Sequence, residues 1–190
     1  MPATALDPRT ALVIIDLQKG LASRPSVHPM PGIIDSAARL AAAFRRAQLP
    51  VVLVSVGFSE DGGDRLQPRA DQRMNLPFTP DFADIVPELG PEPSDLRIVK
   101  RQPNAFYGTE LDLQLRRRGV TGIVLAGFTS SNGVDSTARG AFERAYNVTF
   151  ASDAITDFDP AAHDFVFQKI FPRLGETDTT EAILALLAKR

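Results

Sequence analysis

Three stretches of the sequence end in groups that can do chemistry. Asp16 ends the apolar run "ALVIID", Lys100 ends "LRIVK", and the run "IVLAG" leads into the turn "GFTSSNG", residues 127–133. Ligands of parallel α/β sheets bind at the carboxyl ends of the strands. If these runs are parallel strands, an acid, a base and a turn rich in backbone N–H groups meet at one rim, which favours a catalytic site.

The turn lacks an obvious nucleophile. The chain contains no cysteine, which excludes thiol nucleophiles, disulfides and thiolate metal sites, and Gly133 stands where a reactive side chain would be expected. A serine needs a positioned base to act as a nucleophile, and the two histidines, His28 and His163, lie outside this stretch. We therefore expect no serine nucleophile. The serines considered are Ser130, Ser131 and Ser136.

Each group also has a structural alternative. Asp16 can cap the segment "LQKG" or pair with a lysine, since a buried acid at a strand end is commonly structural. Lys100 precedes Arg101 and can be a surface charge, and the turn can be a plain βα loop rich in Ser and Asn. Only the combination of the three favours chemistry.

The elements that position these groups follow from short apolar runs without alternation, which are typical of strands buried on both faces. The expected strands are 11–16, 51–56, 96–100, 123–127, 148–154 and, more weakly, 172–176. The expected helices are 33–47, 110–118, 133–145, 161–171 and 178–189, the last capped near Thr177 or Asp178. Alternating strands and helices indicate parallel βαβ units in a three-layer α/β/α sandwich.

Residues 57–93 do not fit this alternation, being rich in Pro, Gly and charge. A loop of this length in a compact domain is usually functional or disordered. Because Phe78, Phe82 and Ile85 would be unusual in a solvated linker, we expect the segment to cover a site or a subunit contact. No repeat or domain boundary is visible, so residues 1–190 are expected to form one domain.

Composition excludes several classes of function. A net charge of -2 argues against a nucleic-acid surface, which needs clustered Lys and Arg. No apolar run reaches the ~18 residues that span a bilayer, and the N-terminus shows no secretion signal. We therefore expect a cytoplasmic protein with a small-molecule substrate and neither nucleic-acid nor membrane partners.

Three blocks of the sequence resemble the signatures of the isochorismatase-like hydrolases. They are "ALVIIDLQKG", "VKRQPNAFYGTELDLQLRRRGV" and "GIVLAGFTSSNGVDSTARGAFERAYNVTFASDA". The resemblance implies a six-stranded parallel sheet in the order 3-2-1-4-5-6 and a homodimer or homotetramer. The family carries an Asp, a Lys and usually a Cys as catalytic triad, which the resemblance places at Asp16, Lys100 and Gly133.

The glycine at the cysteine position separates two kinds of relative. Members that hydrolyse amides through a thioester, such as nicotinamidases, need the thiolate, whereas true isochorismatases cleave a vinyl ether and resemble this chain in having Gly there. In them the Asp protonates the vinyl carbon and water completes the reaction. Burial can keep such a carboxyl protonated near neutral pH, while a neighbouring ammonium opposes this. Asp16 would be the acid, and Lys100 would tune it or hold a substrate carboxylate.

The resemblance also implies the rest of the site. A cis peptide is expected between Phe128 and Thr129, where N–H groups and the following helix end form an anion or carbonyl pocket. The expected substrate-binding residues are Gln18, Phe128, Thr129, Asn132 and Gly133, and candidate cations for substrate carboxylates are Arg69, Arg73 and Arg101. Relatives with a metal hold it through an Asp and His cluster after the second strand. Here "SVGFSEDGG" has no histidine, so neither a metal nor another cofactor is expected.

Three hypotheses of function remain open. The first is a hydrolase that acts on a small anionic substrate without a covalent intermediate. The second is a catalytically inactive family member that binds a small molecule or serves as a scaffold; turnover on a panel of vinyl ethers and amides would separate the two. The last is a flavodoxin-type nucleotide-binding protein, which "DLQKGLAS" disfavours because it lacks a Gly-rich phosphate loop.

Overall fold

The computed structural model describes residues 2–71 and 79–189. Six strands form one sheet in the order β3-β2-β1-β4-β5-β6, and every strand pair is parallel. The strands are β1 (Thr10–Ile15), β2 (Val51–Val56), β3 (Leu96–Lys100), β4 (Gly122–Phe128), β5 (Asn147–Thr156) and β6 (Glu176–Asp178). The strand number, direction and order implied by the resemblance are confirmed.

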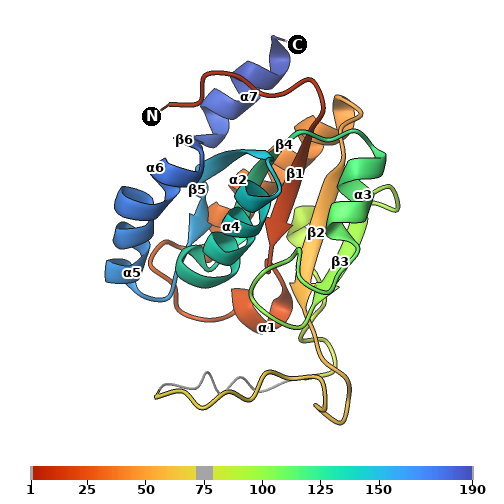
Figure 1. Ribbon diagram of the computed structural model, residues 1–190, viewed down its shortest axis with the longest axis vertical. Helices are drawn as coiled ribbons and strands as arrows, with labels where there is room; N and C mark the ends of the chain where they lie inside the picture. Colours follow the sequence, from red (N-terminus) through yellow and green to blue (C-terminus); the bar gives the residue numbers. More distant parts are fainter. Residues whose placement is uncertain (1, 72–78, 190) are drawn as a thin grey trace.

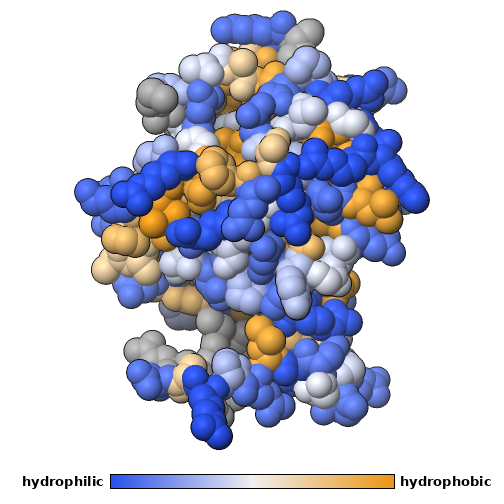
Figure 2. Space-filling view, in the orientation of Figure 1, coloured by the Kyte–Doolittle hydropathy of each residue, from blue (hydrophilic) through white to orange (hydrophobic). Residues whose placement is uncertain are grey.

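Helices cover both faces of the sheet, so the three-layer architecture is confirmed as well. They are α1 (Lys19–Ala22), α2 (Met30–Arg46), α3 (Leu111–Arg117), α4 (Asp135–Glu143), α5 (Pro160–Phe165), α6 (Phe171–Leu174) and α7 (Thr180–Ala188). In Figure 1, α3 and α4 lie in front of the sheet and α2 lies behind it. Figure 2 shows the same face in space-filling form, where hydrophilic side chains predominate and hydrophobic ones are interspersed among them.

The central strand β1 shows why the sequence has continuous apolar runs. Leu12 and Ile14 pack into the core beneath α2 and α7, whereas Val13 and Ile15 pack into the core beneath α3 and α4. All four side chains are at most 1% exposed. A strand with a core on each side has no solvent face, and therefore no polar alternation.

Several expected boundaries are wrong, among them the start of α2, which is Met30 rather than residue 33, and the helix expected at 161–171, which α5, a π-type turn (Val166–Ile170) and α6 share. The sixth strand is Glu176–Asp178 rather than 172–176, because the preceding residues form α6, whose Phe171 stacks on Phe150 at 3.9 Å between ring centroids. The last helix begins at Thr180, since the hydroxyl of Thr179 accepts a hydrogen bond from the backbone N–H of Ala182. The helix expected from residue 133 is preceded by a π-type turn, Ser130–Val134, so helical backbone starts three residues earlier.

The long segment between β2 and β3 leaves the sheet and returns to it (Figure 1). Its returning half packs on the core: Phe82 is 3% exposed, and Ile85 pairs with Gln18 in an antiparallel bridge. A Cβ added to Gly20 would lie 2.0 Å from the Phe82 ring, so the buried ring leaves no room for a side chain at position 20. Phe78 lies outside the described residues. Within the described ranges, no helix has the length and apolar character to cross a membrane.

Candidate active site

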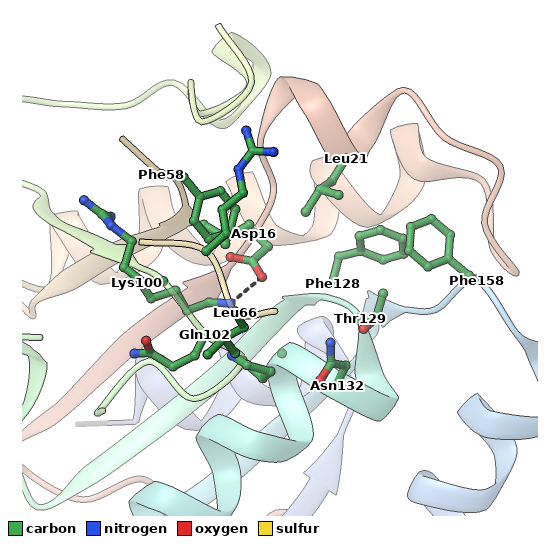
Figure 3. A pocket seen from close by; sticks show the side chains of 15 residues that line it. Asp16, Leu21, Phe58, Leu66, Lys100, Gln102, Phe128, Thr129, Asn132 and Phe158 are labelled. Atoms are coloured by element: carbon green, nitrogen blue, oxygen red, sulfur yellow. Dashed lines mark hydrogen bonds and ion pairs between the residues drawn. The ribbon is translucent and has the colours of Figure 1, made fainter. Parts of the chain in front are cut away.

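A cavity of about 280 Å³ opens at the carboxyl edge of the sheet, where β1, β3 and β4 end (Figure 3). Asp16, Lys100 and Gly133 all line it, so the three positions singled out at strand ends lie in one place. The other lining residues are Leu21, Val56, Phe58, Arg65, Leu66, Arg101, Gln102, Pro103, Phe128, Thr129, Asn132 and Phe158.

Asp16 and Lys100 form a buried ion pair. The Nζ of Lys100 donates to Oδ2 of Asp16 at 2.7 Å, and the two side chains are 3% and 7% exposed, with Lys100 the more buried. Asp16 follows β1 with a φ of 54°, in the left-handed region, and its N–H still donates to Val54 in β2. The acid is therefore fixed by the strand end on one side and by the ammonium on the other.

The two oxygens of Asp16 differ. Oδ2 accepts from Lys100, whereas Oδ1 is buried and has no hydrogen-bond partner among the described residues. Burial raises the pKa of Asp16, and the charge and hydrogen bond of Lys100 oppose this rise. A buried polar atom without a partner is costly and rare, and is often explained by function. Oδ1 is thus the atom of this pair whose hydrogen-bonding capacity is unused, on a residue that lines the cavity.

The turn after β4 brings Gly133 against the acid. The peptide bond between Phe128 and Thr129 is cis. A Cβ added to Gly133 would lie 3.1 Å from Oδ2 of Asp16. At Gly127, with φ 118°, a Cβ would lie 2.0 Å from the backbone oxygen of Ile15, so only glycine allows β4 to approach the end of β1 this closely. This approach places the turn beside Asp16.

The apolar walls of the cavity come from distant segments. Phe128 and Phe158 meet edge to face with ring centroids 4.5 Å apart, at the ends of β4 and β5. Phe58 and Leu66 come from the segment after β2, and Phe58 lies on the opposite side of the Asp16 carboxylate from these two rings in Figure 3. The sequence analysis did not identify Phe58, Leu66 or Phe158, although it expected the segment to cover a site. Local periodicity gave no signal for them.

Of the arginines considered for binding substrate carboxylates, the structure places some at the cavity and others away from it. Arg101 lines the cavity and its Nε donates to Asp64 at 2.5 Å, while Arg69 is exposed and does not line it. Arg73 lies outside the described residues. Arg65, which the sequence analysis did not consider, also lines the cavity, with its guanidinium 5.4 Å from the centroid of the Phe58 ring. Two arginines therefore stand at this pocket.

Gln18 is not brought to the cavity. Its side chain is fully buried and its Nε2 donates to the backbone oxygens of Val56 and Phe82, while Oε1 accepts from the N–H of Val56. The amide thus ties the end of β2 to the returning segment. The resemblance implied a substrate contact for Gln18, whereas these hydrogen bonds give its side chain a structural role.

A second buried polar cluster lies outside the cavity lining. The Oγ of Ser130 donates to Oδ2 of Asp157 at 2.7 Å and lies 3.1 Å from Nδ1 of His163. In a catalytic triad the histidine stands between the serine and the acid. Here Ser130 stands between them, and it is fully buried. The arrangement braces the turn and does not supply a nucleophile.

No metal site is visible in residues 2–71 and 79–189, where no three His, Asp or Glu side chains are grouped to hold an ion. Chemistry without a metal or another cofactor stays a prediction. The groups at hand are a carboxyl, an ammonium, two guanidiniums and the backbone N–H groups of the turn.

Comparison with known proteins decides the family. An isochorismatase domain model matches residues 10–182. The chain belongs to the isochorismatase family of hydrolases. The uncharacterized isochorismatase family protein YwoC of Bacillus subtilis is 42% identical over 179 residues, covering 93% of each chain. An isochorismatase family protein from Burkholderia thailandensis superposes with a TM-score of 0.94 at 41% identity, covering 97% of this chain and 98% of that one.

One similar family member has a named activity. Ureidoacrylate amidohydrolase RutB of Methylorubrum extorquens is 31% identical over 179 residues, covering 80% of this chain and 72% of RutB. Family membership therefore gives the general class, a hydrolase. It leaves the bond that is cleaved to be argued from the site.

Proposed function

We propose that this isochorismatase-family chain hydrolyses a small anionic substrate without a covalent intermediate, with Asp16 as the proton donor. One observation carries the proposal. A buried carboxyl with a raised pKa has one oxygen held by Lys100 and the other without a partner in the described parts of the chain, and a glycine faces it instead of a nucleophile. A carboxyl group in this state can act as a general acid.

The bond that suits such an acid is the vinyl ether. Oδ1 of protonated Asp16 gives its proton to the terminal vinyl carbon, and the ether carbon becomes an oxocarbenium ion. Water adds to that carbon and loses a proton, and the resulting hemiketal breaks down to a carbonyl compound and an alcohol. Lys100 then stabilises the carboxylate left on Asp16, since its ammonium already binds Oδ2. Asp16 regains its proton from water.

Binding of the substrate is assigned to three kinds of group. Phe128 and Phe158 provide an apolar wall, and the backbone N–H groups of Thr129 and Gly133 are the donors at the turn, near the start of a helix. Arg65 and Arg101 provide the positive charge that makes an anion the favoured substrate. A volume of about 280 Å³ lies at the small end of ligand pockets, which fits a small metabolite.

Amide hydrolysis through a thioester is a poorer fit to the site. It requires a thiolate at the position of Gly133, and the chain has no cysteine. The amidohydrolase activity in the name of RutB is therefore not transferred to this chain. The same glycine supports the second candidate, a family member that retains the pocket as a binding or scaffold protein and has no turnover.

The test begins with a panel of vinyl ethers and amides bearing carboxylates, assayed with the parent protein. Turnover on vinyl ethers alone supports the first candidate, and binding without turnover on any member supports the second. On the substrate found, Asp16→Asn should lower turnover by at least ~10²-fold, the scale of a positioned general acid. Substrate affinity should change much less, because the arginines and N–H groups remain.

The matched control is Asp95→Asn, which neutralises another buried, cation-paired acid far from the cavity. It should lower the denaturant midpoint and leave turnover unchanged. Retained turnover in Asp16→Asn, together with a lowered midpoint, would show that Asp16 serves only as a partner for Lys100.

A further inference from the structure

Asp157, the first residue after β5, has a buried carboxylate with an unusual set of partners. Oδ2 accepts from the Oγ of Ser130 at 2.7 Å and from the N–H of Ser131 at 2.6 Å. Oδ1 accepts from the N–H of Phe158 at 2.7 Å and from that of Asp159 at 3.4 Å. The residue is 3% exposed, and no ion pair with it occurs among the described residues. A buried carboxylate of this kind is held by N–H and O–H donors alone.

The two oxygens hold two different walls of the cavity. Oδ2 fixes the beginning of the turn Ser130–Val134, which carries Asn132 and Gly133 into the cavity. Oδ1 fixes the backbone of Phe158, whose ring lines the cavity and packs on Phe128. One carboxylate therefore links the backbone turn that faces Asp16 to the aromatic wall beside it.

A second brace acts on the same turn. The Ser130 hydroxyl gives its hydrogen to Asp157, so its oxygen is left to accept from Nδ1 of His163, 3.1 Å away. His163 is in turn wedged between the rings of His28 and Phe167, with centroid distances of 4.9 and 4.5 Å. The start of the turn is thus held from two sides by groups that never touch the cavity.

We propose that Asp157 is a positioning residue of the active site, whose carboxylate sets the place of the Asn132–Gly133 backbone relative to the Asp16–Lys100 pair. The inference deepens the proposed function and rests on it. A charged acceptor at the start of a helical run also interacts favourably with the positive helix end. The amide of an asparagine keeps the shape, but it can place only one acceptor oxygen, so one of the two walls loses its anchor.

The same strand provides a matched control. Asp153, in β5, accepts at Oδ1 from the N–H of Thr180 at 2.6 Å and from its hydroxyl at 2.8 Å. These are the same two donor types that meet Oδ2 of Asp157, but they belong to α7, away from the cavity. Asp153→Asn therefore removes the same negative charge without touching the site, and its remaining oxygen can still accept both bonds from Thr180.

The experiment uses a thiol at position 133 as a reporter, so it needs no substrate. In Gly133→Cys the new Cβ lies 3.1 Å from Oδ2 of Asp16, beside the Lys100 ammonium and the start of the helix. These groups favour a thiolate, and Asp16, with its raised pKa, can take up the thiol proton. The reaction of the thiol with iodoacetamide, titrated against pH, should have its midpoint below the free value of about 8.5.

Adding Asp157→Asn to this reporter should make the thiol about threefold to tenfold less reactive at pH 7, with the midpoint moved upward by about half to one pH unit. The loss of a negative charge by itself would favour the thiolate and move the midpoint downward. An upward shift therefore reports a displaced backbone. Ser130→Ala, which changes no charge, should shift the midpoint in the same direction by less, and Asp153→Asn should not shift it.

The proposal would be overturned if Asp157→Asn left the pH midpoint of thiol reactivity unchanged or lowered it, and reduced only the denaturant midpoint of unfolding. Asp157 would then be only a helix cap. If Asp157→Asn does not fold, Ser130→Ala decides by the same criterion. The assay is independent of turnover. Retained turnover in Asp16→Asn would remove the proposed function and leave the reporter result intact, so the two failures can be told apart.

Discussion

Two buried acid–base pairs lie at opposite edges of the sheet and differ in how completely they are satisfied. At the amino edge of the sheet, Arg45 donates two hydrogen bonds to Asp95, from Nε to Oδ1 at 3.0 Å and from Nη2 to Oδ2 at 2.8 Å. The backbone N–H of Glu92 donates a third, to Oδ2, at 2.8 Å. At the carboxyl edge, Lys100 gives Asp16 one bond of 2.7 Å and leaves Oδ1 without a partner in the described structure.

The difference shows how similar sequence features serve stability or chemistry. A guanidinium matches a carboxylate in a planar fork and can occupy both of its oxygens. An ammonium is a point charge, which can bind one oxygen and leave the second open. Both oxygens of the first pair's acid are occupied, whereas the second pair keeps one oxygen with unused hydrogen-bonding capacity on a residue that lines a cavity. Two variants test this comparison, and a third tests the turn that lies beside the open pair.

The largest effect is expected at the structural pair. Arg45→Met removes the cation and leaves the Asp95 carboxylate, whose side chain is 1% exposed, without its partner. Breaking a buried pair in this way typically lowers the free energy of unfolding by about 3–5 kcal/mol. Denaturant unfolding measures this loss. When Arg45→Met is combined with Gly133→Cys, the pH midpoint of the thiol's reaction with iodoacetamide should not change. A loss below about 1 kcal/mol would mean that Asp95 is satisfied well enough by backbone donors.

A smaller and pH-dependent effect is expected at the open pair. Lys100→Met removes the charge that opposes the raised pKa of Asp16, so the pKa should rise further. A raised folded-state pKa contributes stability that is fully present below the unfolded value and is lost as pH rises through the folded value. The stability cost of Lys100→Met should therefore be larger at pH 8 than at pH 5. Equal losses at both pH values would show that Asp16 does not change its charge over this range.

The smallest effect is expected at His163, beside the turn. Burial lowers the pKa of His163, and the neighbouring His28 lowers it further, while Asp157 and Asp164 oppose the change. A depressed histidine pKa contributes stability above the unfolded value of 6.5 that is lost as pH falls through the folded value. The denaturant midpoint should therefore fall between pH 7 and pH 5, and less so in His163→Gln. Parallel profiles for parent and variant would contradict this.

The sequence predicts the catalytic edge because its signals are local. Asp16 and Lys100 end apolar runs, and the parallel topology brings strand ends together without knowledge of any contact. The remaining groups depend on contacts between distant positions. The Ser130 hydroxyl meets residues 27 and 33 positions later in the chain, and Phe58 and Leu66 belong to a segment without periodicity. The hydrogen bonds of Gln18 to Val56 and Phe82 also join positions 38 and 64 residues apart, so the sequence around Gln18 gave no signal for them.

The left-handed backbone of Asp16 limits the paths by which this site can diverge. At a φ of 54°, Asn and Gly are tolerated well, whereas β-branched residues such as Val or Ile are strongly disfavoured. A lineage that gave up the acid would be expected to drift first to Asn or Gly and to keep the strand end intact. An aliphatic residue at this position would mark a deeper change, in which the end of β1 had been rebuilt. The conformation of one residue thus separates the loss of a chemical group from the loss of the frame that held it.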